Sequence, residues 1–326
     1  MSSTLSDYDY SLPRDLIAQR PLAQRDASRM MVVHRDGQSI EHRRFRELMA
    51  FLAPDDLLVL NNTRVLPARR FSDDGAIEFL FLERLAPARW RCLVKPGRKM
   101  RVGALTKIDN VTARVEEIAA DGERVISLDK EVDLYSGGSM PLPPYIGRSS
   151  DAEDEARYQT VFAQNPGAIA APTAGLHFTR GMLREIRHTF ITLHVGPGTF
   201  RPVQTDDVAD HRMEVEQFSI SSDAADKIDN ARRVIAVGTT TVRVLESAQR
   251  REGQLIAQSG ATDIFIYPPF EFVVVDALLT NFHLPRSTLL MLVSAFAGRE
   301  LVLRAYEEAI RERYRFYSYG DCMLIL

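Results

Sequence analysis

A stretch of short strands without a helical pattern interrupts this sequence, and it constrains the possible folds more than any other feature. Between about Arg70 and Tyr135 the apolar residues alternate with polar ones or form short runs, broken by Ala-Pro, Pro-Gly and Asp-Gly turns. Strands in such close succession predict a small barrel or sandwich. The expected strands are Ile77–Leu82, Trp90–Val94, Val111–Ile118 and Val125–Leu128.

The sequence beyond this stretch has a different pattern, in which helices alternate with strands. It begins with an acid-rich segment, residues 151–164, whose acidic residues favour a helix N-terminus. Alternation of this kind predicts a mostly parallel sheet that helices cover. The expected strands are Phe190–Val195, Val234–Val237, Asp263–Ile266 and Phe272–Val275, and the expected further helices are Met182–His188, Thr240–Arg250, Ser287–Phe296 and Glu300–Tyr314.

Two apolar runs that precede the β stretch indicate how the domains are connected. Met30–Val33 and Leu57–Leu60 have the character of buried strands. Glycines and prolines between Gly137 and Pro144 suit a linker at the exit of the β stretch. We therefore predict an α/β domain made of residues 1–69 and 151–326, with an inserted all-β barrel domain of residues 70–150.

The composition excludes several classes of protein. Hydrophobic residues make up 45% of the chain and charged residues 26%, as in ordinary globular proteins. No apolar run approaches the roughly 20 residues that a membrane-spanning helix needs. No signal or transit peptide is readable at the N-terminus, so we expect a cytoplasmic protein. The two cysteines, Cys92 and Cys322, form no CxxC pair and indicate neither a disulfide framework nor a zinc cage.

The charged residues are unevenly distributed, although the net charge is only −3. Leu85–Ile108 contains no Asp or Glu, and Asp109–Asp133 then holds eight acidic residues. Two interpretations are open: the basic stretch is a solvated surface, or it binds the phosphates of a nucleic acid. Its seven basic residues are Arg89, Arg91, Lys95, Arg98, Lys99, Arg101 and Lys107.

Four segments at the ends of predicted strands and helices can approach a ligand closely. Gly238–Thr241 links a strand to a helix, where backbone N–H groups can bind an anion or a carboxylate. The other three each contain one histidine; they are Ala171–Thr179, His194–Pro202 and Thr280–Thr288. Histidine titrates near neutrality, so these residues are candidates for acid–base catalysis, with a structural role as the alternative for each.

A possible metal motif and a possible nucleophile are both weak. If His211 lay on a strand, it would face away from Glu214 and Glu216, and on a helix it would share a face with Glu214 alone. Cys322 follows Asp321 but lacks the flanking signature of a nucleophilic hydrolase. We expect neither a metal site nor a hydrolytic nucleophile.

Ten segments in fixed order extend over nearly the whole chain: Arg20–Val32, Leu57–Arg69, Pro141–Ile146, Arg157–Ala163, Ala170–Thr179, Ile191–Val203, Val237–Ser247, Thr262–Ile266, Leu278–Gly298 and Tyr319–Ile325. Together they resemble one family, the S-adenosylmethionine:tRNA ribosyltransferase-isomerases of queuosine biosynthesis. The sequence departs from the usual pattern at Ala261 (usually Trp), Pro269 (usually Gly) and Cys322 (usually a small residue), and its β stretch is shorter.

The resemblance implies a reaction and its substrates. The ribosyl group of S-adenosylmethionine would be transferred and isomerised onto 7-aminomethyl-7-deazaguanine at the tRNA wobble position, which gives epoxyqueuosine-tRNA, adenine and methionine. It also implies an α/β domain with an inserted β-barrel and no metal or prosthetic group. We further expect a monomer. Two alternatives are an S-adenosylmethionine-dependent tRNA methyltransferase and a non-catalytic RNA-binding module. The first lacks its glycine-rich fingerprint here, and the second does not explain the histidine-bearing turns.

This chemistry assigns roles to residues. A base must take a proton from the ribose 5′ carbon beside the sulfonium, and an acid should assist the departure of adenine. The catalytic candidates are His177, His194, His283, Asp263 and Asp321. Arg243 and Glu246 are expected to orient the amino-acid part of the donor, and Gly196, Gly198 and Thr239 to supply backbone donors. The other substrate-binding candidates are Thr173, Gly175, Thr199, Arg201 and Asn281, and the RNA-binding candidates are Arg89, Arg91, Lys95, Arg98, Lys99 and Arg101.

Overall fold

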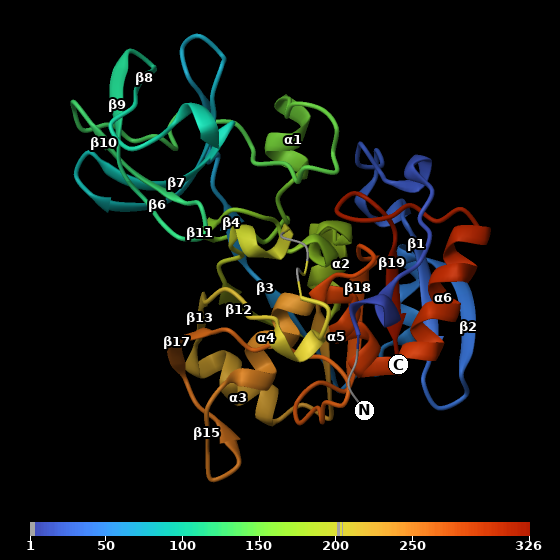
Figure 1. The fold of residues 1–326 in the computed structure, drawn as a ribbon. Coiled ribbons are helices and arrows are strands. Elements are labelled where there is room, and N and C mark those ends of the chain that lie inside the picture. The colour runs from blue at the N-terminus through green and yellow to red at the C-terminus, as the bar shows by residue number, and fades with distance from the viewer. Residues whose placement is uncertain (1–3, 201–202, 204) are drawn as a thin grey trace. The chain divides into compact units, whose positions relative to one another are not determined.

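The computed structural model describes residues 4–200, 203 and 205–326, without the side chains of residues 199 and 200. The chain divides into two compact units (Figure 1). We call them the α/β unit, which consists of Met1–Arg64, Pro144–Arg148 and Arg157–Leu326, and the β unit, which consists of Val65–Pro143 and Ser149–Ala156. The β unit thus begins five residues before the expected boundary at position 70 and ends at Ala156 rather than at residue 150, while residues 144–148, which we expected in it, belong to the α/β unit.

Within its described residues, the α/β unit contains a nine-stranded mixed sheet of order β17-β13-β12-β3-β14-β18-β19-β1-β2. The central strands β12, β3, β14 and β18 form a continuous parallel set, and β19 and β1 form a second parallel pair. The prediction of a mostly parallel sheet is therefore wrong toward the edges, where a tight hairpin makes β1 and β2 antiparallel and where β13, β17 and β19 also join antiparallel neighbours. The bounds are β1 Arg29–His34, β2 Ser39–Arg44, β3 Asp56–Asn61, β12 His188–Leu193, β13 Glu216–Ile220, β14 Arg233–Val237, β17 Gln258–Thr262, β18 Ala277–Asn281 and β19 Cys322–Ile325.

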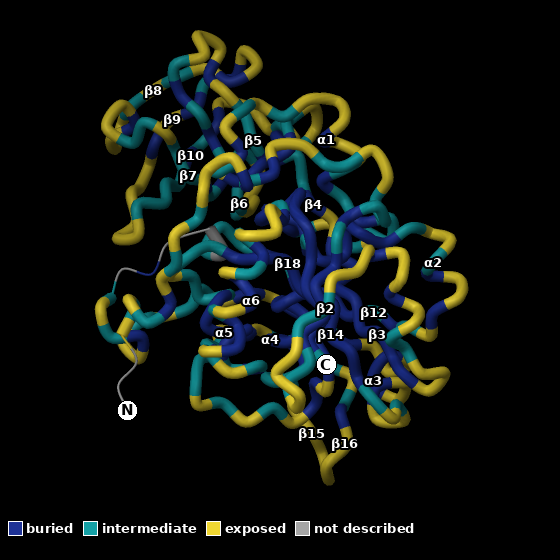
Figure 2. Tube along the Cα trace, turned by 90° about the vertical axis from the view of Figure 1, so that its right-hand side faces the viewer, coloured by how far each residue is buried: buried dark blue, intermediate teal, exposed yellow. Residues whose placement is uncertain are grey.

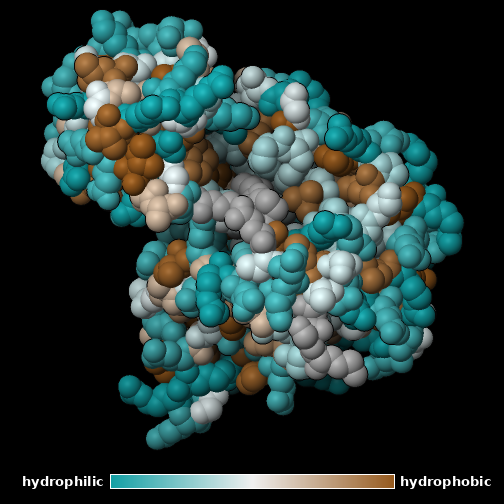
Figure 3. Space-filling model, in the orientation of Figure 1, coloured by the Kyte–Doolittle hydropathy of each residue, from teal (hydrophilic) through white to brown (hydrophobic). Residues whose placement is uncertain are grey.

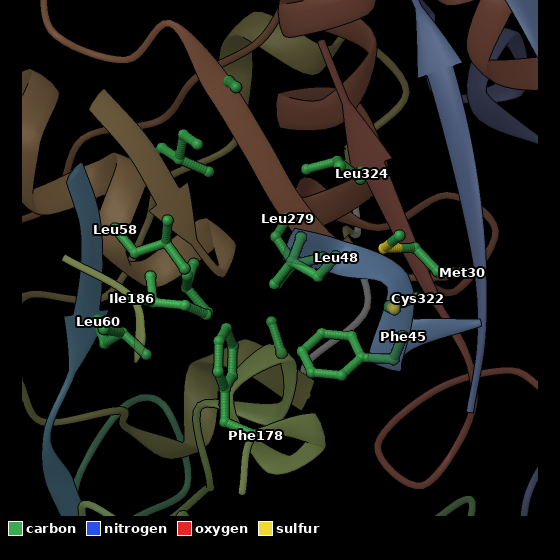
Figure 4. Packing of buried hydrophobic residues seen from close by; sticks show 14 of the residues in the cluster. Met30, Phe45, Leu48, Leu58, Leu60, Phe178, Ile186, Leu279, Cys322 and Leu324 are labelled. Carbon is green, nitrogen blue, oxygen red and sulfur yellow. The ribbon is translucent and has the colours of Figure 1, made fainter. Parts of the chain in front are cut away.

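The central strands are buried on both faces, as their continuous apolar runs predict. Every residue of β3 is buried, so that Leu57 and Val59 on one face and Leu58 and Leu60 on the other all lie away from solvent. Leu58 and Leu60 belong to a cluster with the buried apolar residues of α2 (Arg180–Glu185) and of the 3-10 helix η4 (Phe45–Phe51; Figure 4). Helices α3 (Ser222–Asp229) and α4 (Thr239–Ser247) also pack against β3 and β12. The burial colouring of Figure 2 shows this sheet as the dark centre of the unit.

The helices begin where the sequence supplies side-chain caps. The hydroxyls of Thr179, Ser221 and Ser287 accept backbone N–H groups at the starts of α2, α3 and α5, each at 3.2 Å. The expected helices near 182, 240, 287 and 300 are all present, whereas the segment 151–164 is helical only over Ala152–Arg157. The bounds are α1 Ala152–Arg157, α2 Arg180–Glu185, α3 Ser222–Asp229, α4 Thr239–Ser247, α5 Thr288–Ala297 and α6 Arg299–Arg311; the 3-10 helices used below are η4 Phe45–Phe51, η5 Gly97–Lys99, η6 Thr173–His177 and η7 Pro197–Phe200.

The β unit is built on a six-stranded antiparallel sheet in its described residues, of order β5-β6-β7-β10-β9-β8. The sheet curls, and the Asp73 N–H just beyond β5 donates to the Lys107 carbonyl of β8 at 2.9 Å. The two edge strands do not form a ladder with each other in the described structure, so this is a curled sheet rather than the closed barrel that we expected. Its core contains Trp90 and Phe81. The bounds are β5 Arg69–Phe71, β6 Glu78–Ala86, β7 Arg89–Lys95, β8 Leu105–Ile108, β9 Val111–Ile118 and β10 Arg124–Leu128.

Two expected strands are absent from the described structure. Asp263–Ile266 is irregular and follows β17, and Phe272–Val275 is irregular and precedes β18. The backbone N–H groups of 273, 274 and 275 donate to the carboxylate of Glu246, so they are not available to a sheet. The described residues also form two small sheets, in which β4 (Thr63–Val65) pairs with β11 (Asn165–Ala168) and β15 (Arg250–Arg251) pairs with β16 (Gln254–Leu255). No helix in the described part of the chain is long and apolar enough to cross a membrane.

Candidate functional site

A pocket in the α/β unit lies at the carboxyl ends of the parallel strands β14 and β18. It encloses about 680 Å³, including space open to solvent. Ligands in open α/β sheets bind at this end of the strands. Residues from four of the segments that the sequence singled out line it, among them Thr173, Val195, Thr239 and His283. Among the described residues, its lining includes no Asp, Glu, Lys or Arg. We call it the main pocket.

The N-terminus of α4 forms one wall of the main pocket. Gly238 precedes the helix with a φ of 91°, a conformation that favours glycine, and its N–H donates to the Leu279 carbonyl of β18 at 2.8 Å. Gly238, Thr239 and Thr240 all line the pocket. The N–H groups of the first helical turn and the positive end of the helix dipole are therefore presented to it.

His283 and Asn281 follow β18 into the main pocket, and both are buried. The His283 Nε2 lies 2.8 Å from the Thr280 hydroxyl, and its backbone N–H donates to the Tyr306 hydroxyl. Burial lowers the pKa of His283 to about 3, so the ring is neutral at physiological pH. The Asn281 amide donates to the Tyr317 carbonyl, while its Oδ1 is buried without a hydrogen-bond partner among the described residues.

His177 lies in a second pocket of the same unit, which encloses about 300 Å³ and which we call the smaller pocket. Its Nδ1 is 2.8 Å from the Ser28 hydroxyl, and its buried Nε2 has no hydrogen-bond partner among the described residues. Burial lowers the pKa of His177 to about 4; Arg25 and Arg315 act in the same direction, and Asn281 partly opposes them. His177 is therefore also neutral near pH 7.

Ser318 lines both pockets. Its hydroxyl is 2.7 Å from the hydroxyl of Tyr145, and the ring of Tyr145 packs against that of Tyr317 with centroids 4.7 Å apart. Our sequence analysis singled out none of these three residues, nor Arg25 and Arg157 of the smaller pocket. The only signal for them was their position inside or beside the matched family segments, because each acquires its role through partners far away in the chain.

The glycine loop after β12 does not offer the backbone donors that we expected. The Gly196 N–H donates to Glu216 and the Gly198 N–H to Glu214, both at 2.9 Å. The Glu216 carboxylate also accepts a hydrogen bond from Arg243, and both of these side chains are buried. These carboxylates engage both N–H groups, so the expected roles of Gly196 and Gly198 toward the substrate stay predictions that their contacts do not support.

Arg243 and Glu246 are also engaged elsewhere. Arg243 pairs with Glu216, and its Nε donates to the Ile264 carbonyl at 3.3 Å. Glu246 accepts three backbone N–H groups from residues 273–275 at 2.9 to 3.1 Å. Neither residue lines the main or the smaller pocket. Both hold the fold around α4, and the prediction that they orient the donor is not supported by their contacts.

The other catalytic candidates lie apart from both pockets. His194 approaches the Thr63 hydroxyl at 2.8 Å, and burial lowers its pKa. Asp321 is buried and accepts the Arg29 and Arg315 backbone N–H groups, each at 2.8 Å; burial raises its pKa. Asp263 is exposed beyond β17. The structure thus gives Asp321 a structural role between β1 and the C-terminal segment.

Three further substrate-binding candidates are not seen to line either pocket. Gly175 is buried in η6, where a side chain would collide with Phe162 and Thr160, and it lines neither pocket. Thr199 belongs to η7, but its side chain is not described. Arg201 lies outside the described residues.

The residues of the weak metal motif do not converge. Glu214 and Glu216 turn toward the glycine loop, whereas the ring of His211 packs against Phe265 with centroids 5.2 Å apart. Over the described ranges, no group of three or more His, Cys, Asp or Glu residues is arranged to hold a metal ion.

The basic stretch of the β unit is partly neutralised in three dimensions. Strand pairing brings acidic residues beside it: Arg89 pairs with Glu116 at 2.9 Å, and Arg91 pairs with Glu83 at 3.1 Å. Trp90 is buried, so it cannot stack on a nucleic-acid base. Within the described part of the chain, Lys95, Arg98, Lys99 and Arg101 form no ion pair. Figure 3 shows hydrophobic areas among hydrophilic ones on this unit, and its exposed apolar residues include Val102 and Leu105.

Comparisons with known proteins agree with one another. A family profile described as "Queuosine biosynthesis protein" matches residues 5–325. Proteins named S-adenosylmethionine:tRNA ribosyltransferase-isomerase are 48% identical in Desulforamulus reducens and 50% identical in Carboxydothermus hydrogenoformans, and each alignment covers 99% of both chains. The crystal structure of S-adenosylmethionine tRNA ribosyltransferase from Thermotoga maritima matches with 40% identity and a TM-score of 0.57, over 98% of this chain and 100% of that one.

Proposed function

The chain belongs to the S-adenosylmethionine:tRNA ribosyltransferase-isomerases of queuosine biosynthesis, and from this premise we propose how its pockets carry out their reaction. It transfers and isomerises the ribosyl group of S-adenosylmethionine onto 7-aminomethyl-7-deazaguanine at the tRNA wobble position. The products are epoxyqueuosine-tRNA, adenine and methionine. Neither the methyltransferase nor the non-catalytic alternative is favoured by the names of the relatives.

The observation that carries the residue-level proposal is the uncharged main pocket at the carboxyl ends of β14 and β18. Its lining combines apolar side chains with a few polar groups, as small-molecule sites do. The unpartnered Oδ1 of Asn281 can accept an N–H or O–H group of adenosine. Because charge develops on adenine as it departs, the N–H groups at the start of α4 can stabilise it. We therefore place the adenosine part of the donor in the main pocket.

His283 is the candidate base of the main pocket. The sulfonium acidifies the neighbouring 5′ carbon, and a neutral imidazole can take the proton from it. His283 is neutral near pH 7, and Thr280 holds its Nε2, so Nδ1 is the ring atom left for the substrate. A low pKa makes this base weak, and the acidity of the carbon must compensate.

We expect His283→Ala to lower turnover about 100-fold or more, as removal of a general base does. His177→Ala should lower turnover to a similar extent if His177 takes part in the proton transfers as acid or base. Turnover is measured as release of adenine with purified donor and substrate tRNA. His211→Ala is the matched control, because His211 lines neither pocket and packs on Phe265; it should retain near-normal turnover. Near-normal turnover of both test variants would contradict an acid–base role for these histidines.

We propose that the β unit binds part of the tRNA through Lys95, Arg98, Lys99 and Arg101. Phosphate contacts position a nucleic acid without specifying its sequence, and cations without an ion pair can make such contacts at least cost. Arg89 and Arg91 belong to the same expected surface, but an acidic residue already pairs with each.

Changing these four residues to Ala should weaken tRNA binding and flatten its salt dependence. The slope of log affinity against log salt should fall by about 0.7 to 0.9 for each phosphate group that the variant no longer binds. Binding is measured at several salt concentrations by a method that does not need turnover. The double variant Arg89→Ala/Arg91→Ala is the control, and its loss of tRNA affinity per substituted residue should be smaller. The proposal fails if the affinity and the slope of the fourfold variant equal those of the unchanged protein.

Three further expectations from the sequence stay predictions. We propose that the enzyme needs no resident metal or prosthetic group, and that S-adenosylmethionine serves as a substrate. We also propose a cytoplasmic location and a monomeric state.

A further inference from the structure

We propose that Tyr10 and Tyr306 are positioning residues for the reaction, because their hydroxyl groups hold the backbone of His283 and thereby fix its ring in the main pocket. This inference deepens the function proposed above, since it rests on His283 as the base. Neither of the two tyrosines lines the main or the smaller pocket. Their hydroxyl groups therefore act on the reaction through the residue that they hold.

The backbone of His283 is bonded to side chains rather than to a strand. β18 ends at Asn281, and residues 282–284 are irregular. The His283 N–H donates to the Tyr306 hydroxyl at 2.9 Å, and the His283 carbonyl accepts the hydroxyl of Tyr10. A tyrosine hydroxyl can both donate and accept, so this residue type suits either position. The two hydroxyls thus satisfy the backbone groups that a sheet would otherwise pair.

The two tyrosines come from distant parts of the α/β unit and contact each other. Tyr306 lies on α6 and is fully buried, and its ring packs against those of Tyr10 and Phe282 with centroids 5.1 and 5.4 Å apart. Tyr10 follows the 3-10 helix η1 (Leu5–Tyr8), whose last carbonyl accepts the Arg286 N–H at 2.9 Å. The N-terminal segment, α6 and the loop after β18 therefore meet at one residue of the main pocket.

The place of the His283 ring depends on this backbone. Its Nε2 is 2.8 Å from the Thr280 hydroxyl, so the ring is held at that atom and, through the backbone, by the two tyrosines. A displacement of about 1 Å at a reacting group can cost about 100-fold in rate. The loss of one tyrosine hydroxyl should therefore lower kcat, while the KM for the donor, which neither tyrosine contacts in the main pocket, stays nearly unchanged.

The test removes each hydroxyl and keeps its ring. Tyr306→Phe and Tyr10→Phe should each lower kcat about 10- to 100-fold with a nearly unchanged KM for S-adenosylmethionine, measured as adenine release by the complete protein with substrate tRNA. Tyr314→Phe is the matched control. Tyr314 is also fully buried and its hydroxyl is 2.8 Å from the Nδ1 of His42, but it lines neither pocket, so its variant should keep the full kcat.

The two substitutions are then repeated in the His283→Ala variant, where the group to be positioned is gone. Loss of either hydroxyl should lower the residual kcat by less than about twofold there, because the effects of residues that act through one group are not additive. An equal fold-loss in both backgrounds would overturn the proposal. It would assign the tyrosines a structural role or, for Tyr10, a role through Tyr317, whose side chain interacts with it.

The failure of this inference is distinguishable from the failure of the proposed base. Reduced turnover of His283→Ala, together with a full kcat of Tyr10→Phe and Tyr306→Phe, would overturn the positioning role alone. Near-normal turnover of His283→Ala would overturn the base and its positioning together. The reaction itself is tested separately, by the products that the unchanged protein releases.

Discussion

Transfer RNA with guanine at the wobble position is expected to give no ribosylated product and no release of adenine above background. The aminomethyl group of the modified base is the nucleophile that captures the ribosyl unit, and guanine has no such amine. With tRNA that bears 7-aminomethyl-7-deazaguanine, adenine and methionine should appear together and in step with the modified tRNA. Chromatography of the small molecules from matched reactions with the two tRNAs measures this effect.

The same chromatograms distinguish ribosyl transfer from methylation. Both reactions start from the same sulfonium, but a methyl transfer leaves S-adenosylhomocysteine, whereas activation at the ribose 5′ carbon leaves methionine and adenine. S-adenosylhomocysteine should therefore be absent. Its appearance, or equal turnover with the two tRNAs, would overturn the proposed reaction.

The centre of the α/β unit could be predicted because its signals are local. β3 and β14 are apolar throughout their centres and lie within one residue of the expected runs at Leu57–Leu60 and Val234–Val237. The start of α4 follows from the glycine and threonines after β14. The irregular segment before β18 could not be predicted, because its backbone groups bond to Glu246, a residue on a different element.

The pockets were predictable only in part, for a similar reason. Histidines beside small residues correctly indicated that the loops after β18 and in η6 approach pockets, and both His283 and His177 line one. Arg25 and Arg157 both line the smaller pocket only when the N-terminal segment folds against the start of the α/β unit's last segment, Arg157–Leu326, and no spacing in the sequence records that proximity.

The charge pattern along the sequence suggested a more basic surface on the β unit than the folded unit has. Residues 85–108 contain no acid, yet the register of β7 with β6 places Glu83 opposite Arg91. An antiparallel sheet pairs residues from different parts of the sequence, so a run of like charges in sequence need not remain one on the surface.

Breaking the buried pair of Arg243 and Glu216 should produce the largest loss of stability. Arg243→Met leaves the Glu216 carboxylate buried, with the Gly196 N–H as a remaining partner, and we expect a cost of about 3 to 5 kcal/mol in the free energy of unfolding. Far-ultraviolet circular dichroism during urea unfolding reports the helices, most of which belong to the α/β unit. Fluorescence of Trp90, the only tryptophan, reports the β unit and should change little.

Two companion variants test whether the pair itself is responsible. Lys227→Met removes an exposed pair with Asp223 on α3 and should cost less than about 1 kcal/mol. In the double variant Arg243→Met/Glu216→Gln neither charge remains buried, so much of the stability should return. An Arg243→Met cost no larger than that of Lys227→Met would contradict the prediction. Because Glu216 joins α4 to the glycine loop, a large cost would mean that the wall of the main pocket and the loop after β12 are held by one buried charge pair.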